Sequence, residues 1–297
     1  MRLFVLWTCL GVGGFAAAAE PGDVVIVDGQ PITQRDVRFL AELRGQPLVE
    51  GQPVPERIVD EAIDRALIRK FLAAKKIAPQ PEFLAQQLQQ VEGLIRKRQE
   101  EPEAFLKRLG YTQEQWEQEL ALPLAWAEYV QQVTPGEQIA AEFQAHRSEL
   151  DGTRIRARHI ILKLPADPTP AQIQVLKDKL AGLRTEILAG RREFAAVAKE
   201  ISESPSRETG GELGVIPFRG RIPAPVAAAA FKLKSGEMTE PVVSPFGVHL
   251  ILVEERIPGQ LSLEDARPQI LEALGRDLWQ RTAGELRARA KIGRPKS

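Results

Sequence analysis

Apolar positions recur at helical spacing through the first half of the chain. Ile58, Ala62, Ile68 and Leu72 form a stripe on one face of a helix predicted over 55–77. The same spacing, together with residues that begin and end helices, predicts further helices over 83–99, 102–109, 112–133 and 137–150. A short apolar run, Val24–Val27, followed by the turn signal Asp28-Gly29, predicts a strand, and Thr33 with Asp36 predicts a helix start. Residues 20–133 are therefore predicted to form a short strand followed by helices.

The pattern changes in the second half of the chain. Two strand-like runs, Arg156–Leu164 and Val248–Val253, enclose two predicted helices over 170–188 and 193–201. Between them lies Gly210-Gly211-Glu212-Leu213-Gly214, in which three glycines among five residues predict a backbone that bends tightly or passes close to another segment. After this region, Ser262 and Asp265 predict the start of a helix that runs to about Ala290.

Residues 1–19 have the pattern of a secretory signal. Arg2 supplies the positive charge, an apolar stretch follows, and three alanines precede Glu20. An uncleaved membrane anchor is the alternative, because the apolar stretch is close to the lower length limit for a spanning helix. A lipoprotein is a poor fit, since Trp7 stands in the segment before Cys9. We expect an exported protein, periplasmic or otherwise extracytoplasmic, with a cleaved signal.

Composition narrows the classes of function. Cys9 is the only cysteine, so a cleaved chain has no thiol, disulfide or cysteine–metal site. Lys and Arg total 40, as do Asp and Glu, which argues against an electrostatic binder of nucleic acid. With 43% hydrophobic residues, the chain is long enough for two domains.

Five blocks in the second half resemble the parvulin-type peptidyl-prolyl isomerases. In order they are ARHIIL, EFAAVAKEISESPS, GGELGVI, AAFKLKSGEMTEPV and SPFGVHLILVEE. They cover about a third of the chain and keep the family's order and spacing. The flanking segments resemble the secreted bacterial foldases of the SurA and PrsA kind, by their architecture more than by motifs.

The resemblance implies an α+β fold. We expect a parvulin-like domain over 153–258, a four-stranded antiparallel sheet with surrounding helices, inserted into a mostly helical chaperone-like domain. That helical domain would be formed by residues 20–150 and by a C-terminal helix within 262–297 that packs on the N-terminal helices. Residues 1–19 would be the signal peptide.

Rotation about an X–Pro bond must give up amide resonance, at a cost of about 18–20 kcal/mol. The reaction requires no nucleophile, metal or cofactor, and we expect none. An apolar environment favours the twisted amide over the more polar planar one, and a few pre-placed polar groups can assist the nitrogen. The expected site is an apolar proline pocket beside a small hydrogen-bonded polar cluster.

Four residues stand at positions that the resemblance assigns to the polar cluster. His159 and His249 would face each other on central strands as hydrogen-bonded neighbours, either moving a proton or supporting the site. Ser244 matches a hydroxyl position beside the second histidine. Ser204 is a departure, because the family usually has an acidic residue or a cysteine there, and a hydroxyl brings no charge to the site.

Four further residues stand at positions for the substrate pocket. Leu213 and Ile222 match apolar lining positions. Val226 stands where the family often has a phenylalanine, and since valine cannot stack on a prolyl ring, core packing is the preferred interpretation for it. Phe246 could fill part of the gap.

The expected partners are unfolded or proline-containing client polypeptides, with no nucleic acid and no small-molecule cofactor. An uncleaved anchor would keep the protein at a membrane. Trp116, Trp126 and Tyr129 could line a client groove, although aromatic residues at helical spacing are more often core. A holdase chaperone with a weakly active or inactive parvulin domain is the main alternative, and a module that binds one dedicated partner is a third.

Overall fold

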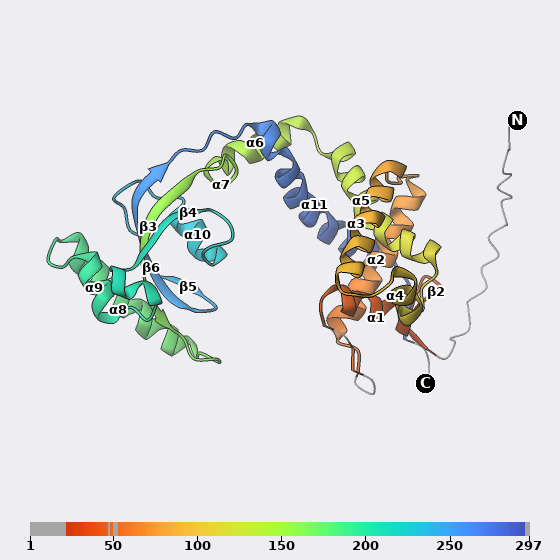
Figure 1. Cartoon of the computed structure of the whole chain (residues 1–297), viewed down its shortest axis with the longest axis horizontal. Helices are drawn as coiled ribbons and strands as arrows, with labels where there is room; N and C mark the ends of the chain where they lie inside the picture. Colours follow the sequence, from red (N-terminus) through yellow and green to blue (C-terminus); the bar gives the residue numbers. More distant parts are fainter. Residues whose placement is uncertain (1–21, 47, 50–52, 295–297) are drawn as a thin grey trace, which may run out of the picture. The chain divides into compact units, whose positions relative to one another are not determined.

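The computed structural model describes residues 22–46, 48–49 and 53–294 of the 297-residue chain. The chain divides into two compact units. One unit contains the chain up to Thr134 together with the residues from Leu271 onward, and the other is the continuous stretch Pro135–Ile270. Figure 1 colours the chain along its sequence, so the red and yellow helices of the first unit can be followed to the blue C-terminal helix. The predicted signal peptide, with Cys9, lies outside the described residues.

The first unit is mainly helical and contains a small antiparallel sheet in the order β2-β1-β7. Its elements are β1 (Asp23–Val27), β2 (Gln30–Thr33), α1 (Gln34–Leu43), α2 (Glu56–Ala74), α3 (Pro81–Lys97), α4 (Pro102–Leu109), α5 (Gln113–Val133), most of α11 (Leu263–Arg287) and β7 (Ile292–Gly293). Predicted caps are present: Thr33 N and Oγ1 donate to the Asp36 carboxylate, and Thr112 Oγ1 accepts from Gln115 N. Gly110 ends α4 in the left-handed conformation, as its place after an amphipathic run predicts.

The C-terminal helix α11 completes the core of this unit. Trp126 on α5 donates its indole N–H to the carbonyl of Gly275 over 3.0 Å and packs edge-on against Trp279. Arg287 forms ion pairs with Asp60 and Asp64 on α2. Trp126 is 7% exposed and Trp116, elsewhere in the unit, is 2% exposed, so the interpretation of the two tryptophans as core is confirmed.

The second unit is built on a four-stranded antiparallel sheet in the order β4-β3-β6-β5, which confirms the predicted α+β fold. Its elements are α6 (Gly136–Ala145), α7 (Arg147–Leu150), β3 (Arg154–Lys163), α8 (Pro170–Leu188), α9 (Phe194–Ile201), the 3₁₀ helix η1 (Pro205–Thr209), β4 (Glu212–Pro217), α10 (Ala224–Ala230), β5 (Val242–Ser244), β6 (Gly247–Ile257) and the first residues of α11. Figure 1 shows α8 and α9 beside one end of this sheet and α10 beside β4 and β5.

Each face of this sheet packs into its own apolar cluster. Ile160 and Leu162 of β3 pack with Leu180 of α8 and with α9. The alternate residues Ile155 and Ala157 pack with α10 and with Ile216, Ile251 and Val253. Because side chains alternate along a strand, His159 points to the same face as this second cluster. We call that face the α10 face.

Three features differ from the sequence prediction. β2 was not predicted, because it is four residues long and contains Pro31, which weakens any strand pattern. Beyond the C-terminal helix, Ile292 and Gly293 form a strand that was not predicted; they pair with β1, which becomes the central strand of its sheet. The helix predicted over 137–150 is interrupted at His146, whose backbone (φ −116°, ψ 27°) leaves the helical region. Among the described residues, no helix combines the length and apolar character needed to cross a bilayer.

Candidate active site

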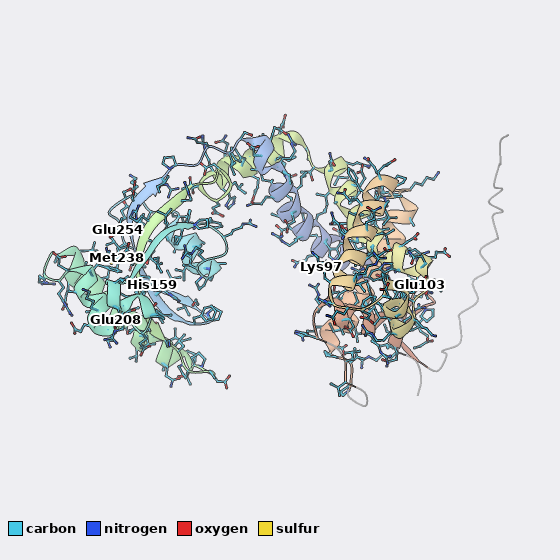
Figure 2. The ribbon with its side chains drawn as sticks, viewed as in Figure 1. Lys97, Glu103, His159, Glu208, Met238 and Glu254 are labelled. Atoms are coloured by element: carbon cyan, nitrogen blue, oxygen red, sulfur yellow. The ribbon has the colours of Figure 1, made fainter. Side chains whose placement is uncertain are left out.

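His159 lies on β3 and is held by two hydroxyl groups. Its Nε2 atom is 2.9 Å from Ser204 Oγ and 2.9 Å from Ser206 Oγ. Ser206 Oγ also donates to Ser204 Oγ over 3.0 Å, so the three side chains form a closed triangle. All three residues are half-buried, which leaves the triangle within reach of a bound chain. Figure 2 labels His159 on the central part of the sheet.

His249 lies on the neighbouring strand β6 in a more enclosed setting. Its Nε2 atom is 2.7 Å from Ser244 Oγ, which also accepts the backbone N–H of Phe246 over 3.1 Å. His249 is 3% exposed and Ser244 is 5% exposed. Nδ1 of His249 is buried and has no hydrogen-bond partner among the described residues. His249 and Ser244 therefore form the buried, supporting half of the polar cluster.

The two imidazoles are neighbours but are not hydrogen-bonded to each other. In the antiparallel pairing of β3 and β6, His159 is opposite Ile251, and His249 is opposite Ile161, so the histidines are diagonal neighbours. Their ring centroids are 6.3 Å apart and the rings are tilted by 31°. The direct hydrogen bond that the family resemblance implied is absent from the described residues: each ring's Nε2 bonds to serine, and Nδ1 of His249 has no partner.

Both histidines are neutral at physiological pH. Burial lowers the pKa of His159 from 6.5 to about 4. Burial also lowers the pKa of His249 to about 4, with a further contribution from the charge that His159 would carry. The site therefore offers hydrogen bonds from neutral imidazoles and hydroxyls.

The loop that carries the serines is fixed to the edge of β3. Ser202 is fully buried, and its Oγ accepts the backbone N–H of Ile161. The backbone N–H of Glu203 donates to the carbonyl of Ile161 over 2.9 Å. The pairing of β3 with β4 ends at Arg158, and from Ile161 onward this loop, not β4, is bonded to the edge of β3. The loop directs Ser204 and Ser206 toward His159.

Gly211 explains why the sequence has glycines here. Its φ is +82°, and a Cβ atom built on it would lie 2.3 Å from the carbonyl oxygen of His159. The backbone N–H of His159 donates to the carbonyl of Gly211 over 2.8 Å. The prediction of a bent backbone in close approach to another segment is confirmed, and the segment approached is that of His159.

The apolar candidates gather on the α10 face. Leu213 and Ile222 are half-buried and pack against the same cluster as Val226, which is fully buried. Val226 is thus a core residue, which is the interpretation that the sequence analysis preferred. Ile251, opposite His159, belongs to this cluster, so the apolar region borders the polar one. Phe246 is separate from these three, on the β5–β6 turn, where it is 66% exposed.

Two polar residues of this site were not predicted. Ser206 is the second hydroxyl on His159, and Ser202 anchors the loop to β3. A signal for both was present, since Ser202, Ser204 and Ser206 alternate in a segment that leads out of a helix. Residues at such spacing in an extended stretch point to one side. In the part of the chain that the structure describes, no group of three His, Cys, Asp or Glu side chains is placed to hold a metal ion.

Comparison with known proteins gives consistent results. The family model for the rotamase, or PPIC-type PPIase, domain matches residues 159–255. "Chaperone SurA" of Polaromonas sp. is 41% identical over 116 residues, which are 39% of this chain and only 24% of that protein. "Probable parvulin-type peptidyl-prolyl cis-trans isomerase" of Bordetella pertussis is 27% identical over 284 residues, 93% of this chain and 95% of that protein.

Among solved structures, the chain is similar to the peptidylprolyl isomerase PrsA of Bacillus cereus. The identity is 21%, with 93% of this chain and 94% of that chain covered and a TM-score of 0.48, a likeness too low to support an inference about function. The matched family model and the Bordetella relative both carry the name of this isomerase class. Residues 159–255 match the PPIC-type peptidyl-prolyl isomerase domain, and over this segment the chain is similar to the parvulin-type isomerases.

Proposed function

We propose that this protein is an exported foldase that catalyses rotation about X–Pro bonds in unfolded secreted and envelope proteins. The carrying observation is the arrangement on the α10 face, where His159 with its two hydroxyls borders an apolar cluster that includes Leu213 and Ile222. The reaction is non-covalent and uses no cofactor. Export rests on the signal-like residues 1–19, and residues 153–258 would be the catalytic domain.

The neutral state of the site suits this reaction. The barrier comes from amide resonance, which stabilises a planar, dipolar peptide bond. An apolar surface that receives the prolyl ring disfavours this dipolar form relative to the twisted one. Ser204, Ser206 and His159 then supply hydrogen bonds at the border of that surface.

We assign the proton arrangement as follows. Ser204 Oγ accepts from Ser206 Oγ and from the backbone N–H of Ser206. If His159 Nε2 carries its proton, it donates to Ser206 Oγ, because both lone pairs of Ser204 Oγ are already used, and the hydroxyl proton of Ser204 has no acceptor within the triangle. That proton is then directed to the substrate, where it can bond the prolyl nitrogen as the amide conjugation is lost.

The test is an isomerase assay on the chain that begins at Glu20, with proline-containing peptides and an unfolded protein as substrates. We expect catalysis that the His159→Gln variant largely abolishes. His146→Gln is the matched control, because His146 is the third histidine, is exposed and contacts Glu149 outside this cluster. Loss of activity in both variants, or in neither, would reject the assigned site.

A holdase chaperone with a weak isomerase is the second candidate. It is favoured by Ser204, which leaves the site without the family's usual acid or thiol, and by the full burial of Val226. Rates equal to the uncatalysed reaction, combined with suppression of client aggregation, would support the holdase. Catalysis removed by His159→Gln would support the isomerase.

A further inference from the structure

The helical unit contains a cleft that the isomerase function does not use. It has a volume of about 560 Å³ and lies among the β1–β2 hairpin, α1, α2 and the start of α5. Val27, Ile32, Leu40 and Leu67 supply apolar lining. The volume falls in the range of about 300–1,000 Å³ that is typical of ligand sites. The cleft is formed by side chains of this unit alone.

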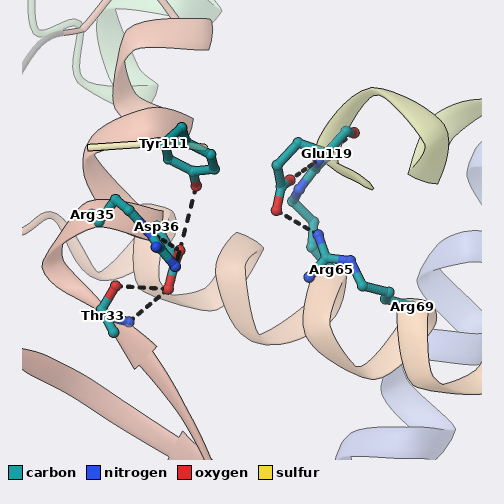
Figure 3. A network of polar contacts seen from close by, with 7 residues as sticks. All are labelled: Thr33, Arg35, Asp36, Arg65, Arg69, Tyr111 and Glu119. Carbon is teal, nitrogen blue, oxygen red and sulfur yellow. Dashed lines mark hydrogen bonds and ion pairs between the residues drawn. The ribbon is translucent and has the colours of Figure 1, made fainter. Parts of the chain in front are cut away.

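One carboxylate in this cleft is shared by two arginines. Glu119 Oε2 is 2.6 Å from Arg65, and Glu119 Oε1 is 2.6 Å from Arg69. Figure 3 shows both guanidinium groups reaching Glu119 from α2. The side chains of Arg65 and Glu119 are 16% and 13% exposed, and that of Arg69 is 40% exposed. The triad therefore carries one excess positive charge, located at its most accessible member.

The other acidic groups of the lining are already occupied. Asp36 accepts from Thr33, Arg35 and Tyr111, as Figure 3 shows. Asp28 is 2.7 Å from Lys70. Four cationic and three anionic side chains line the cleft. The whole lining therefore has the same net charge as the triad, one excess positive charge.

Arg69 has unused hydrogen-bonding capacity. A guanidinium has five N–H donors, and its planar fork matches a carboxylate. Nε of Arg69 is buried and has no partner among the described residues, and Glu119 engages one of the two terminal nitrogens. The donors open to a ligand are therefore the remaining N–H groups of the terminal nitrogens, on a side chain that is 40% exposed. A second carboxylate could therefore bind Arg69 while Glu119 stays paired with Arg65. Such bonds between charged groups are shorter and stronger than neutral ones.

We propose that this cleft binds a carboxylate of a polypeptide whose neighbouring side chains are apolar. The guanidinium of Arg69 receives the carboxylate, and the accessible apolar lining of Pro31, Ala66 and Ala73, over a buried floor that includes Ile32 and Leu67, receives the apolar side chains. A free C-terminus and an internal acidic residue both supply this chemistry. The site is independent of the isomerase centre, and its occupant is recognised by charge rather than by proline.

The experiment measures peptide affinity of the full chain by fluorescence anisotropy. Three proline-free apolar pentapeptides are compared: one with a free C-terminal carboxylate, one amidated, and one amidated with an internal glutamate. We expect the free acid to bind about tenfold more tightly than the neutral amide. Tight binding of the glutamate peptide would assign the site to carboxylates generally, and weak binding would assign it to chain termini. Affinity for the charged peptides should fall with rising salt.

Two variants should change this affinity in opposite directions. Arg69→Gln removes the excess charge but leaves Arg65 paired with Glu119. It should lower the affinity for the free-acid peptide about tenfold and leave the affinity for the amidated peptide unchanged. Glu119→Gln removes the internal competitor and should strengthen binding several-fold. Arg96→Gln, an equal charge change on α3 outside the cleft, is the control.

The signs of these changes decide the outcome. Weakening by both variants would show that the triad only maintains the fold, and no change in either would place binding elsewhere; both results overturn the proposal. If Arg69→Gln unfolds, as thermal melting would reveal, the increase expected of Glu119→Gln still tests it. The isomerase rate of Arg69→Gln should equal that of the unchanged chain, so failure of this site is separable from failure of the catalytic one.

Discussion

The two polar centres of this protein are built in contrasting ways. On the α10 face, neutral imidazoles and hydroxyls are positioned by backbone contacts, with Gly211 against His159 and the serine loop bonded to β3. In the helical unit, the cleft is organised by ion pairs between side chains, such as those of Glu119 with Arg65 and Arg69. A site that lowers the barrier to rotation about a bond needs neutral polar groups held in fixed positions. A site that binds a charged group needs a net charge of the opposite sign.

The strongest test of this contrast compares the loss of stability caused by a change at a backbone contact with that caused by the removal of a charged side chain. Gly211→Ala should destabilise the isomerase unit by about 3 kcal/mol or more, because a left-handed φ is combined with a clash against the His159 carbonyl. Gly214→Ala, also left-handed but with open space around it, should cost about 1–2 kcal/mol. Arg69→Gln should cost below about 1 kcal/mol. Urea unfolding of the three variants provides the comparison, and equal losses at the two glycines would contradict it.

The next largest effect is expected from pH. The folded protein holds both histidines at a pKa of about 4, below the ordinary 6.5, so the unfolded chain binds more protons between these values. Stability is therefore fully present above pH 6.5 and is lost as the pH falls toward 4. We expect a decrease of about 1–2 kcal/mol from pH 6 to pH 5.

His159→Gln should reduce this pH dependence by about half, because one of the two buried imidazoles is removed. Titration of the three histidine signals by NMR would measure the pKa values directly. Signals of both His159 and His249 titrating near 6.5 would show that these imidazoles are not desolvated as the structure has them. Since no histidine is among the lining residues of the cleft, peptide binding there should not follow this titration.

A smaller effect is expected from removing single hydroxyls. Ser204→Ala should lower the isomerase rate about fivefold and Ser206→Ala about twofold, since only the first hydroxyl is assigned to the substrate. The double variant should lose about tenfold or more, because His159 Nε2 then has neither partner. A larger loss for Ser206→Ala than for Ser204→Ala would reverse the proton assignment.

The smallest effect is expected from a substitution that introduces a charge into the neutral active site. Ser204→Asp places a carboxylate beside His159 Nε2, and it should raise the pKa of His159 and increase the isomerase rate about two- to threefold. Ser206→Asp is the matched control on the same nitrogen. An unchanged rate with a raised pKa would show that local charge does not limit catalysis in this domain.

The fold was predictable where local chemistry determines it. Capping pairs such as Thr33–Asp36 and the helix terminator Gly110 act within a few residues, so they are legible in the sequence. The cleft was not predictable, because Arg65 and Glu119 are 54 residues apart and only the tertiary fold brings them together. Strand β7 was not predicted for a similar reason. It has only two residues, and they form a strand only because they pair with β1, which is far away in the sequence.

The candidate site was predictable in identity but not in geometry. The family motifs pointed to His159, Ser204, Ser244 and His249, and the structure groups them into two hydroxyl–imidazole sets. The motifs did not include Ser206, which shares His159 with Ser204, although its alternation with Ser202 and Ser204 was visible in the sequence. They also implied a bond between the rings that the serines replace.

Strand β7 and helix α11 have a consequence for biosynthesis. The helical unit lacks one edge strand and part of its core until residues 271–294 exist, whereas every residue of the isomerase unit has been synthesised by Ile270. Synthesis from the N-terminus thus completes the isomerase unit while the helical unit still lacks β7 and most of α11. Contacts spanning more than two hundred positions, such as Arg287 to Asp60, cannot form before residue 287 has been synthesised.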